Sequence, residues 1–185
     1  MTQPAIDQFV ASVRNILAEF GATEASLTRV GEQMRILAGT PGLVEERQGE
    51  AAMHHSEATS TILHTDGRDG LTLMLAKFPE SAPTPVHDHN SWVVACVVSG
   101  RDRYQHFERL DDGTNTEHAQ LRLLYERELA PGDVVVWQSP PHDIHAQQGI
   151  GGDAWELVLF GVNAMAIPRR YFDLETGAVR EAMPQ

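Results

Sequence analysis

The stretch Pro85–Gly100, which reads PVHDHNSWVVACVVSG, contains the residues that decide the fold. His87 and His89 are two positions apart, and residues at that spacing in a strand point to the same face. The strongly apolar run Trp92–Val98 follows them and ends at a glycine. The pair therefore stands at the start of a buried strand, where two neighbouring imidazoles suit two ligands of one metal.

A second histidine segment lies further along the chain. Pro131–Trp137 reads as a turn that leads into a buried strand, and Pro140–His145, with the sequence PPHDIH, follows it. His145 could supply a third imidazole from a neighbouring strand, and Asp143 could orient a ring by accepting its free N–H. His142 is the competing candidate, but its three-residue separation from His145 predicts that the two do not share a strand face.

Paired histidines also occur on protein surfaces by chance, so the metal interpretation depends on the two segments together. The other histidines have ordinary interpretations. His54 and His55 lie in a polar stretch that is typical of a surface, and His106 and His118 flank a turn-rich hairpin and are expected to be exposed. His64 precedes a turn, so we expect it at the end of a strand.

Short apolar runs separated by turn residues follow residue 58, which favours an antiparallel β-barrel or sandwich. Upstream, residues 4–20 and 24–38 have apolar residues at three- and four-residue spacing, which predicts two helices, with Thr23 as a candidate cap of the second. We therefore expect a mainly β single domain over 1–185, with helices in 1–42 and a barrel over 58–178. The apolar runs are Ile62–Leu63, Leu71–Phe78, Trp92–Val98, Leu121–Tyr125, Val134–Trp137 and Trp155–Val162.

The composition excludes several classes of protein. The 185 residues are 42% hydrophobic and carry a formal net charge of −12, which argues against nucleic-acid or anionic-membrane partners. No apolar run approaches the ~18 residues of a membrane span, and the first helix is amphipathic, unlike a signal peptide. The single cysteine, Cys96, cannot form an internal disulfide, so we expect a core residue in a cytoplasmic protein.

The two histidine segments resemble the two motifs of the cupin superfamily, whose barrels bind a metal inside. The glutamate that is usual in the first motif is replaced by Val93, and an all-histidine site of this kind resembles that of the thiol dioxygenases. That group includes cysteine dioxygenase and mercaptopropionate dioxygenase. The segments that look like bacterial members are Ile62–His64 (ILH), His87–Trp92 (HDHNSW), Asp143–His145 (DIH), Arg169–Asp173 (RRYFD) and Thr176–Gly177.

The resemblance implies a cupin-type jelly-roll barrel, a double-stranded β-helix, in which His87, His89 and His145 bind Fe(II). It also implies a reaction in which a small thiol, cysteine- or mercaptopropionate-like, takes up both atoms of O2 and becomes a sulfinate. The candidate substrate-binding residues are Ser60, Trp92, Phe160, Arg169 and Arg170, with Lys77 as a further candidate for binding a carboxylate.

The substrate side departs from the family pattern. The family's Ser–His–Tyr relay is replaced by Glu156, Val158 and Phe160, and Ser60 or Thr61 stands where the family has an Arg or Gln that grips the substrate carboxylate. Glu156 is a candidate catalytic residue. If it faces inward, it could be a metal ligand, a base or a partner for a substrate amine; if it faces outward, it is a solvated strand residue.

Alternatives therefore stay open. The chain could be a cupin dioxygenase acting on a non-thiol such as a dicarbonyl compound, or a metal-dependent small-molecule sensor without turnover. Three histidines also bind zinc, nickel or copper, so the pattern does not identify the metal. The apolar stripes of the two helices fit packing on the barrel or a dimer interface, which leaves the oligomeric state open.

Overall fold

The computed structural model describes residues 2–46, 53–55, 58–67 and 70–183. Two helices, α1 (Gln3–Phe20) and α2 (Glu24–Ala38), precede a series of antiparallel strands. The strands are β1 (Met53–His55), β2 (Ala58–Thr65), β3 (Thr72–Phe78), β4 (Val86–His87), β5 (Val93–Ser99), β6 (Asp102–Arg109), β7 (Leu121–Leu129), β8 (Val134–Trp137), β9 (His145–Gly149), β10 (Ala154–Phe160), β11 (Arg169–Phe172) and β12 (Val179–Ala182).

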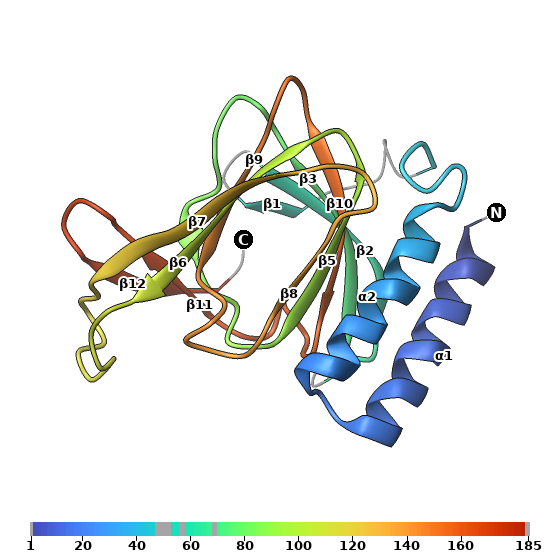
Figure 1. The fold of residues 1–185 in the computed structure, drawn as a ribbon, viewed down its shortest axis with the longest axis horizontal. Coiled ribbons are helices and arrows are strands. Elements are labelled where there is room, and N and C mark those ends of the chain that lie inside the picture. Colours follow the sequence, from blue (N-terminus) through green and yellow to red (C-terminus); the bar gives the residue numbers. More distant parts are fainter. Residues whose placement is uncertain (1, 47–52, 56–57, 68–69, 184–185) are drawn as a thin grey trace.

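The strands form two six-stranded sheets that face each other across a shared interior (Figure 1). One has the order β1-β2-β3-β10-β5-β8, and the other has the order β12-β11-β4-β9-β6-β7. Helices α1 and α2 cover the outer face of the first sheet (Figure 1). The predicted fold class, a mainly β jelly-roll barrel with two N-terminal helices, is confirmed. In the described part of the chain, no helix is both long and apolar enough to cross a membrane.

The two helices form where the apolar spacing predicts them. The residues that α1 buries include Ile6, Phe9 and Val13, one stripe of that spacing. The side chain of Thr23 caps α2 by accepting a hydrogen bond from the Ser26 N–H at 3.2 Å, and the Ser26 hydroxyl accepts one from the Thr23 N–H at 2.9 Å. This reciprocal pair satisfies backbone donors that the first turn of a helix leaves free.

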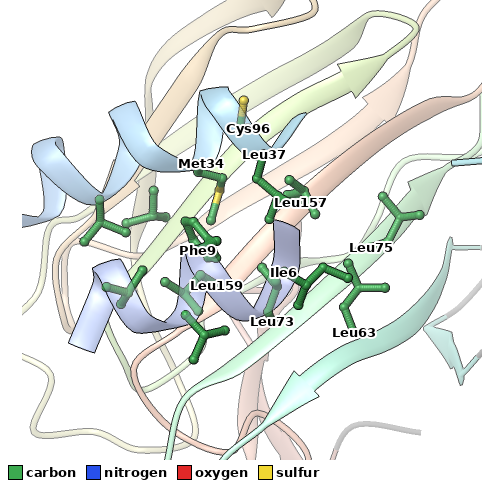
Figure 2. Close-up of a cluster of buried hydrophobic side chains, with 14 of the residues drawn as sticks. Ile6, Phe9, Met34, Leu37, Leu63, Leu73, Leu75, Cys96, Leu157 and Leu159 are labelled. Carbon is green, nitrogen blue, oxygen red and sulfur yellow. The ribbon is translucent and has the colours of Figure 1, made fainter. Parts of the chain in front are cut away.

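An apolar layer joins the helices to the first sheet (Figure 2). Met34 and Leu37 of α2 pack there with Leu157 and Leu159 of β10 and with Cys96 of β5. Burial raises the pKa of the Cys96 thiol to about 12, so this cysteine is a core residue that stays protonated.

The opposite faces of β5 and β10 line the barrel interior. Val93 and Val97 of β5 pack there with Val158 and Phe160 of β10. Because both faces of these strands are buried, they appear in the sequence as unbroken apolar runs without polar alternation.

The apolar runs did not predict β6, β9, β11 or β12, which carry many polar residues. On β6, His106 is half-buried instead of exposed, because its Nδ1 lies 3.0 Å from the Tyr104 hydroxyl and its ring stacks on Tyr125. His118 is exposed, as expected. The side chains of His54 and His55 lie outside the described part of the chain.

The turn between β5 and β6 requires glycine at position 100, where φ is +77°. A Cβ there would lie 2.3 Å from the backbone oxygen of Asp153. We expect Gly100→Ala to lower the free energy of unfolding by about 3 kcal/mol, because it adds a backbone clash to a strained φ. Gly132→Ala is the control, since Gly132 has φ +89° with nothing within 4 Å. It should cost only about 1 kcal/mol, and equal losses in urea unfolding would contradict the clash.

Candidate metal centre

Three histidines converge inside the barrel from two adjacent strands of the second sheet. His87 of β4 and His145 of β9 are direct partners in the antiparallel ladder, and His89 follows β4 at the same-face spacing. The ring centroid of His87 lies 4.7 Å from that of His89 and 4.6 Å from that of His145. One possible ligand atom from each of the three lies within 4.8 Å of the others. All three side chains are buried, and the structure brings together the three histidines that the sequence analysis named.

Backbone carbonyls orient two of these rings. The Nδ1 of His87 lies 2.8 Å from the Pro85 oxygen, and the Nδ1 of His145 lies 2.8 Å from the Asp143 oxygen. A carbonyl only accepts, so each Nδ1 carries the proton and each Nε2 keeps its lone pair for a metal. Burial lowers the pKa of His145 to about 3, so this imidazole is neutral, as a ligand must be. The donor set fits a divalent transition metal.

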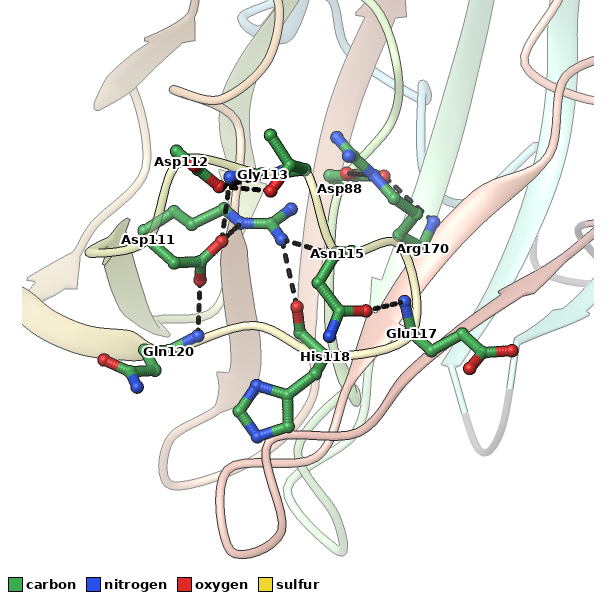
Figure 3. A network of polar contacts seen from close by, with 11 residues as sticks. Asp88, Asp111, Asp112, Gly113, Asn115, Glu117, His118, Gln120 and Arg170 are labelled. Atoms are coloured by element: carbon green, nitrogen blue, oxygen red, sulfur yellow. Dashed lines mark hydrogen bonds and ion pairs between the residues drawn. The ribbon is translucent and has the colours of Figure 1, made fainter.

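Two buried aspartates support the histidine segments, and their carboxylates bind groups other than the histidine rings. The Asp143 carboxylate accepts the His89 backbone N–H at 3.0 Å, so it is the Asp143 carbonyl, and not its carboxylate, that orients a ring. Burial raises the pKa of Asp143 to about 7. Asp88 points away from its flanking histidines and accepts hydrogen bonds from the N–H and Nε of Arg170 on β11 (Figure 3). Together these contacts fasten β4 to both neighbouring segments.

An aromatic wall covers the far side of His145. The Trp137 ring stacks on His145 with centroids 4.4 Å apart and planes 19° apart. The Trp137 Nε1 donates to the Tyr104 hydroxyl, which satisfies the one polar atom of this buried indole. Phe160 meets the edge of His89 from the opposite sheet, with centroids 4.9 Å apart. These contacts pack the rings of His145 and His89 against aromatic side chains.

The histidines open into a cavity of about 210 Å³, which suits a small ligand. Ser60, Phe160 and Arg169, three of the candidate substrate-binding residues, line it. Residues that the sequence analysis did not single out also line it, among them Thr84, Gln147 and Tyr171. Strand parity could have indicated Gln147, because it lies two residues from His145 on the same strand.

Arg169 places a positive charge in this cavity. Its side chain is only 6% exposed, and its guanidinium carbon lies 5.7 Å from the centroid of Phe160. Among the described residues, no hydrogen bond or ion pair satisfies this guanidinium. Burial lowers its pKa to about 10, which leaves it charged at neutral pH. The arrangement suits an anionic group on a ligand.

The structure does not bring the other candidates to the cavity. Arg170 alternates with Arg169 on β11 and faces Asp88 instead. Trp92 packs in the layer beneath the helices, against Gly161. Lys77 pairs with Asp153 at 3.2 Å, in a partly exposed position.

Glu156 faces inward, but it is not part of the histidine group. It is 1% exposed, and its Oε2 accepts a hydrogen bond at 2.9 Å from Nε2 of Gln147, which also lies 3.2 Å from Oδ2 of Asp102. Its Oε1 has no hydrogen-bond partner among the described residues. Burial, and next the charge of Asp102, raises the pKa of Glu156 well above its ordinary 4.5. Burial likewise raises the pKa of Asp102 to about 7. These raised values favour protonated carboxyl groups.

We expect Glu156→Gln to gain stability relative to wild type as the pH rises above 4.5. The raised pKa means that the folded chain keeps a proton that the unfolded chain loses above 4.5, so wild-type stability falls as pH rises. Glutamine cannot titrate, and its side-chain oxygen can still accept from Gln147. Urea unfolding at several values from pH 4.5 to about 7 measures the difference, and parallel profiles would contradict it.

The solved structures to which the fold is similar include two that are described as cupin proteins. One, a cupin superfamily protein of Desulfitobacterium hafniense, is 18% identical, with 62% of this chain and 84% of that chain covered and a TM-score of 0.42. An RmlC-like cupin of Ralstonia eutropha is 18% identical, with 71% and 73% covered and a TM-score of 0.46. KdgF from Halomonas is 19% identical, with 63% and 91% covered and a TM-score of 0.46.

No protein-family model matches the chain, and no curated protein matches it. At these identities and TM-scores, the likeness to solved structures assigns neither an activity nor a metal. The site must be interpreted from its own residues.

Proposed function

We propose that the chain is a metal-dependent dioxygenase that converts a small thiol carrying a carboxylate into its sulfinate. One observation carries the proposal: three buried histidines open into a small cavity that also contains the guanidinium of Arg169, which has no hydrogen bond or ion pair among the described residues. The histidines offer a metal site with open positions, and the guanidinium offers a partner for a carboxylate.

The overall reaction balances without a further reductant. The thiol RSH and one O2 give RSO2H, so the O–O bond breaks, two S–O bonds form, and sulfur supplies the four electrons that oxygen accepts. Bound Fe(II) would supply the redox chemistry and the open positions that a thiolate and dioxygen need. A set of three neutral imidazoles leaves the metal its full charge, which favours the thiolate form of the substrate.

The chain's own residues would then position and shield the substrate. Arg169 would bind the carboxylate, and because it is buried, the ion pair would be little screened by water. Phe160 and Trp137 form apolar parts of the cavity wall and would exclude water from the sulfur. Phe160 carries no hydroxyl, so its role is confined to shape and exclusion of water.

Oxygen uptake by the Fe(II)-loaded protein tests the proposal. The substrates are cysteine, 3-mercaptopropionate and mercaptosuccinate, and the His145→Ala variant serves as the blank. We expect uptake that depends on the thiol, that vanishes in the variant and that is matched by sulfinate in the product.

The other outcomes select the alternatives. No uptake by protein with confirmed bound iron would overturn the thiol reaction, and dicarbonyl compounds would then be tested. Saturable binding of a small molecule without turnover of either class would favour a sensor. Failure to bind any divalent metal would overturn all three.

A further inference from the structure

Gln147 lies two residues after His145 on β9, so both side chains point into the barrel. It is 3% exposed and lines the same cavity as the histidines. We propose that Gln147 is a substrate-positioning residue, whose side-chain oxygen accepts a hydrogen bond from a hydroxyl or N–H group of the ligand. The proposal rests on the proposed function only in taking that ligand to be a thiol.

Two buried carboxyl groups determine which way the amide of Gln147 points. Its Nε2 lies 2.9 Å from Oε2 of Glu156 and 3.2 Å from Oδ2 of Asp102, which come from opposite sheets. Nε2 carries two hydrogens, one for each of these carboxyl oxygens. With Nε2 toward the carboxyl groups, the side-chain oxygen of Gln147 lies on the other side of the amide.

The side-chain oxygen of Gln147 is then the atom left for a ligand. It accepts no hydrogen bond from the described residues, and it is not among the fully enclosed polar atoms that lack a partner. Asp102 is itself held, because its Oδ1 accepts the Gln148 backbone N–H at 3.0 Å. The side-chain oxygen of Gln147 is therefore held in a fixed position that faces the cavity. A buried acceptor that lacks a hydrogen bond raises the free energy of the folded protein.

Ser60 lies at the same level of the barrel as Glu156, the partner of Gln147. Ala76 of β3 pairs with Ser60 on β2 and with Glu156 on β10. The two side chains therefore lie on the same face of the sheet, at the same height along the strands. Ser60 lines the cavity and is 4% exposed, and its hydroxyl has no hydrogen-bond partner among the described residues.

Gln147 and Ser60 lie toward one end of the cavity, and Arg169 lies toward the other. Tyr171 pairs with His87, and Arg169, two residues earlier on β11, lies toward His89. Gln147 lies in the other direction, because its backbone N–H and C=O bond to Thr84. Each step of two residues is about 6.6 Å along a strand. The ligand class is a small thiol with a hydrogen-bond donor on the side of its sulfur that faces away from Arg169.

Binding of two matched thiols tests the assignment without any oxidation. The probes are 2-mercaptoethanol and propanethiol, which differ in a hydroxyl and a methyl group, titrated calorimetrically into zinc-loaded protein without oxygen. For each protein, the Kd of propanethiol divided by the Kd of 2-mercaptoethanol gives its preference for the hydroxyl group. We expect this ratio to be about five- to tenfold larger in wild type than in Gln147→Met. An unchanged ratio in Gln147→Met would overturn the assignment.

Two further variants separate the oxygen of Gln147 from its surroundings. Gln148→Met carries the same substitution on the outer face, where the Gln148 amide bonds the Glu80 carbonyl, and it should keep the wild-type ratio. Glu156→Gln keeps an acceptor for Nε2 and should also keep the ratio. Loss of the preference for 2-mercaptoethanol in Glu156→Gln would overturn the assignment, because the Glu156 carboxyl group would then be the acceptor.

Misfolding and a wrong reaction are both distinguishable from a wrong subsite. If Gln147→Met does not fold, the double variant with Glu156→Leu removes the carboxyl group left without its donor, and the same ratio decides. A hydroxyl preference in the zinc-loaded protein together with no oxygen uptake in the iron-loaded protein would reject the oxidation and support the subsite. Oxygen uptake without the preference would reject the subsite alone.

Discussion

His145→Ala is expected to weaken binding of a divalent metal by at least about a hundredfold, because loss of a ligand should exceed the 10–100-fold cost of losing an outer supporting residue. His145 is central to the site, since its ring lies within 5.0 Å of the rings of both other histidines. Elemental analysis after dialysis measures the metal retained per chain.

His142→Ala is the matched control for this loss. His142 lies only three residues from His145, but it is exposed and outside the histidine group. It should retain metal as wild type does. Full retention of metal by His145→Ala, or equal losses in both variants, would contradict the three-histidine site.

Arg169→Met is expected to raise the KM for 3-mercaptopropionate by roughly ten- to a hundredfold, which corresponds to the loss of a hydrogen bond to a charged group. Cysteamine has no carboxylate, so its KM should change much less. Because the guanidinium is buried without an ion pair among the described residues, its removal should also leave the melting temperature unchanged or higher.

Lys77→Met provides the comparison for Arg169→Met. Lys77 was a further basic candidate for the carboxylate, but it pairs with Asp153 outside the cavity. Its loss should leave both KM values near wild type. An equal rise for cysteamine and 3-mercaptopropionate in Arg169→Met would show that the substitution damages the cavity in general and would contradict a carboxylate contact.

The parts of the fold that the sequence predicted are those with a single strong pattern. The helices follow from apolar spacing, and β3, β5, β8 and β10 follow from apolar runs, because buried strands need no polar alternation. β9 has the sequence HAQQG, and the inward residues His145 and Gln147 are polar. A strand that presents polar groups to the interior carries no hydrophobic signature, so the histidine segment indicated where β9 begins but not how far it extends.

The candidate site was predictable to a similar degree. Same-face spacing was enough to place His87 beside His89, and a second histidine segment was enough to suggest His145. Spacing could not tell Arg169 from Arg170, because alternation leaves open which of the two faces inward until the neighbouring strand is known. Nor could it show that Gln147 stands between Glu156 and the cavity, since that contact joins two sheets.

The two sheets contribute different parts of the site, and this difference is useful for redesign of the barrel. All three histidines and both of their carbonyl partners belong to β4, β9 and the residues beside them. The facing sheet contributes Ser60, Val158 and Phe160 to the cavity wall, and none of its described side chains belongs to the histidine group. A library at Ser60 and Val158 could therefore explore new ligand shapes while the sheet that carries the histidines, and the Trp137 and Phe160 rings that contact them, are kept unchanged.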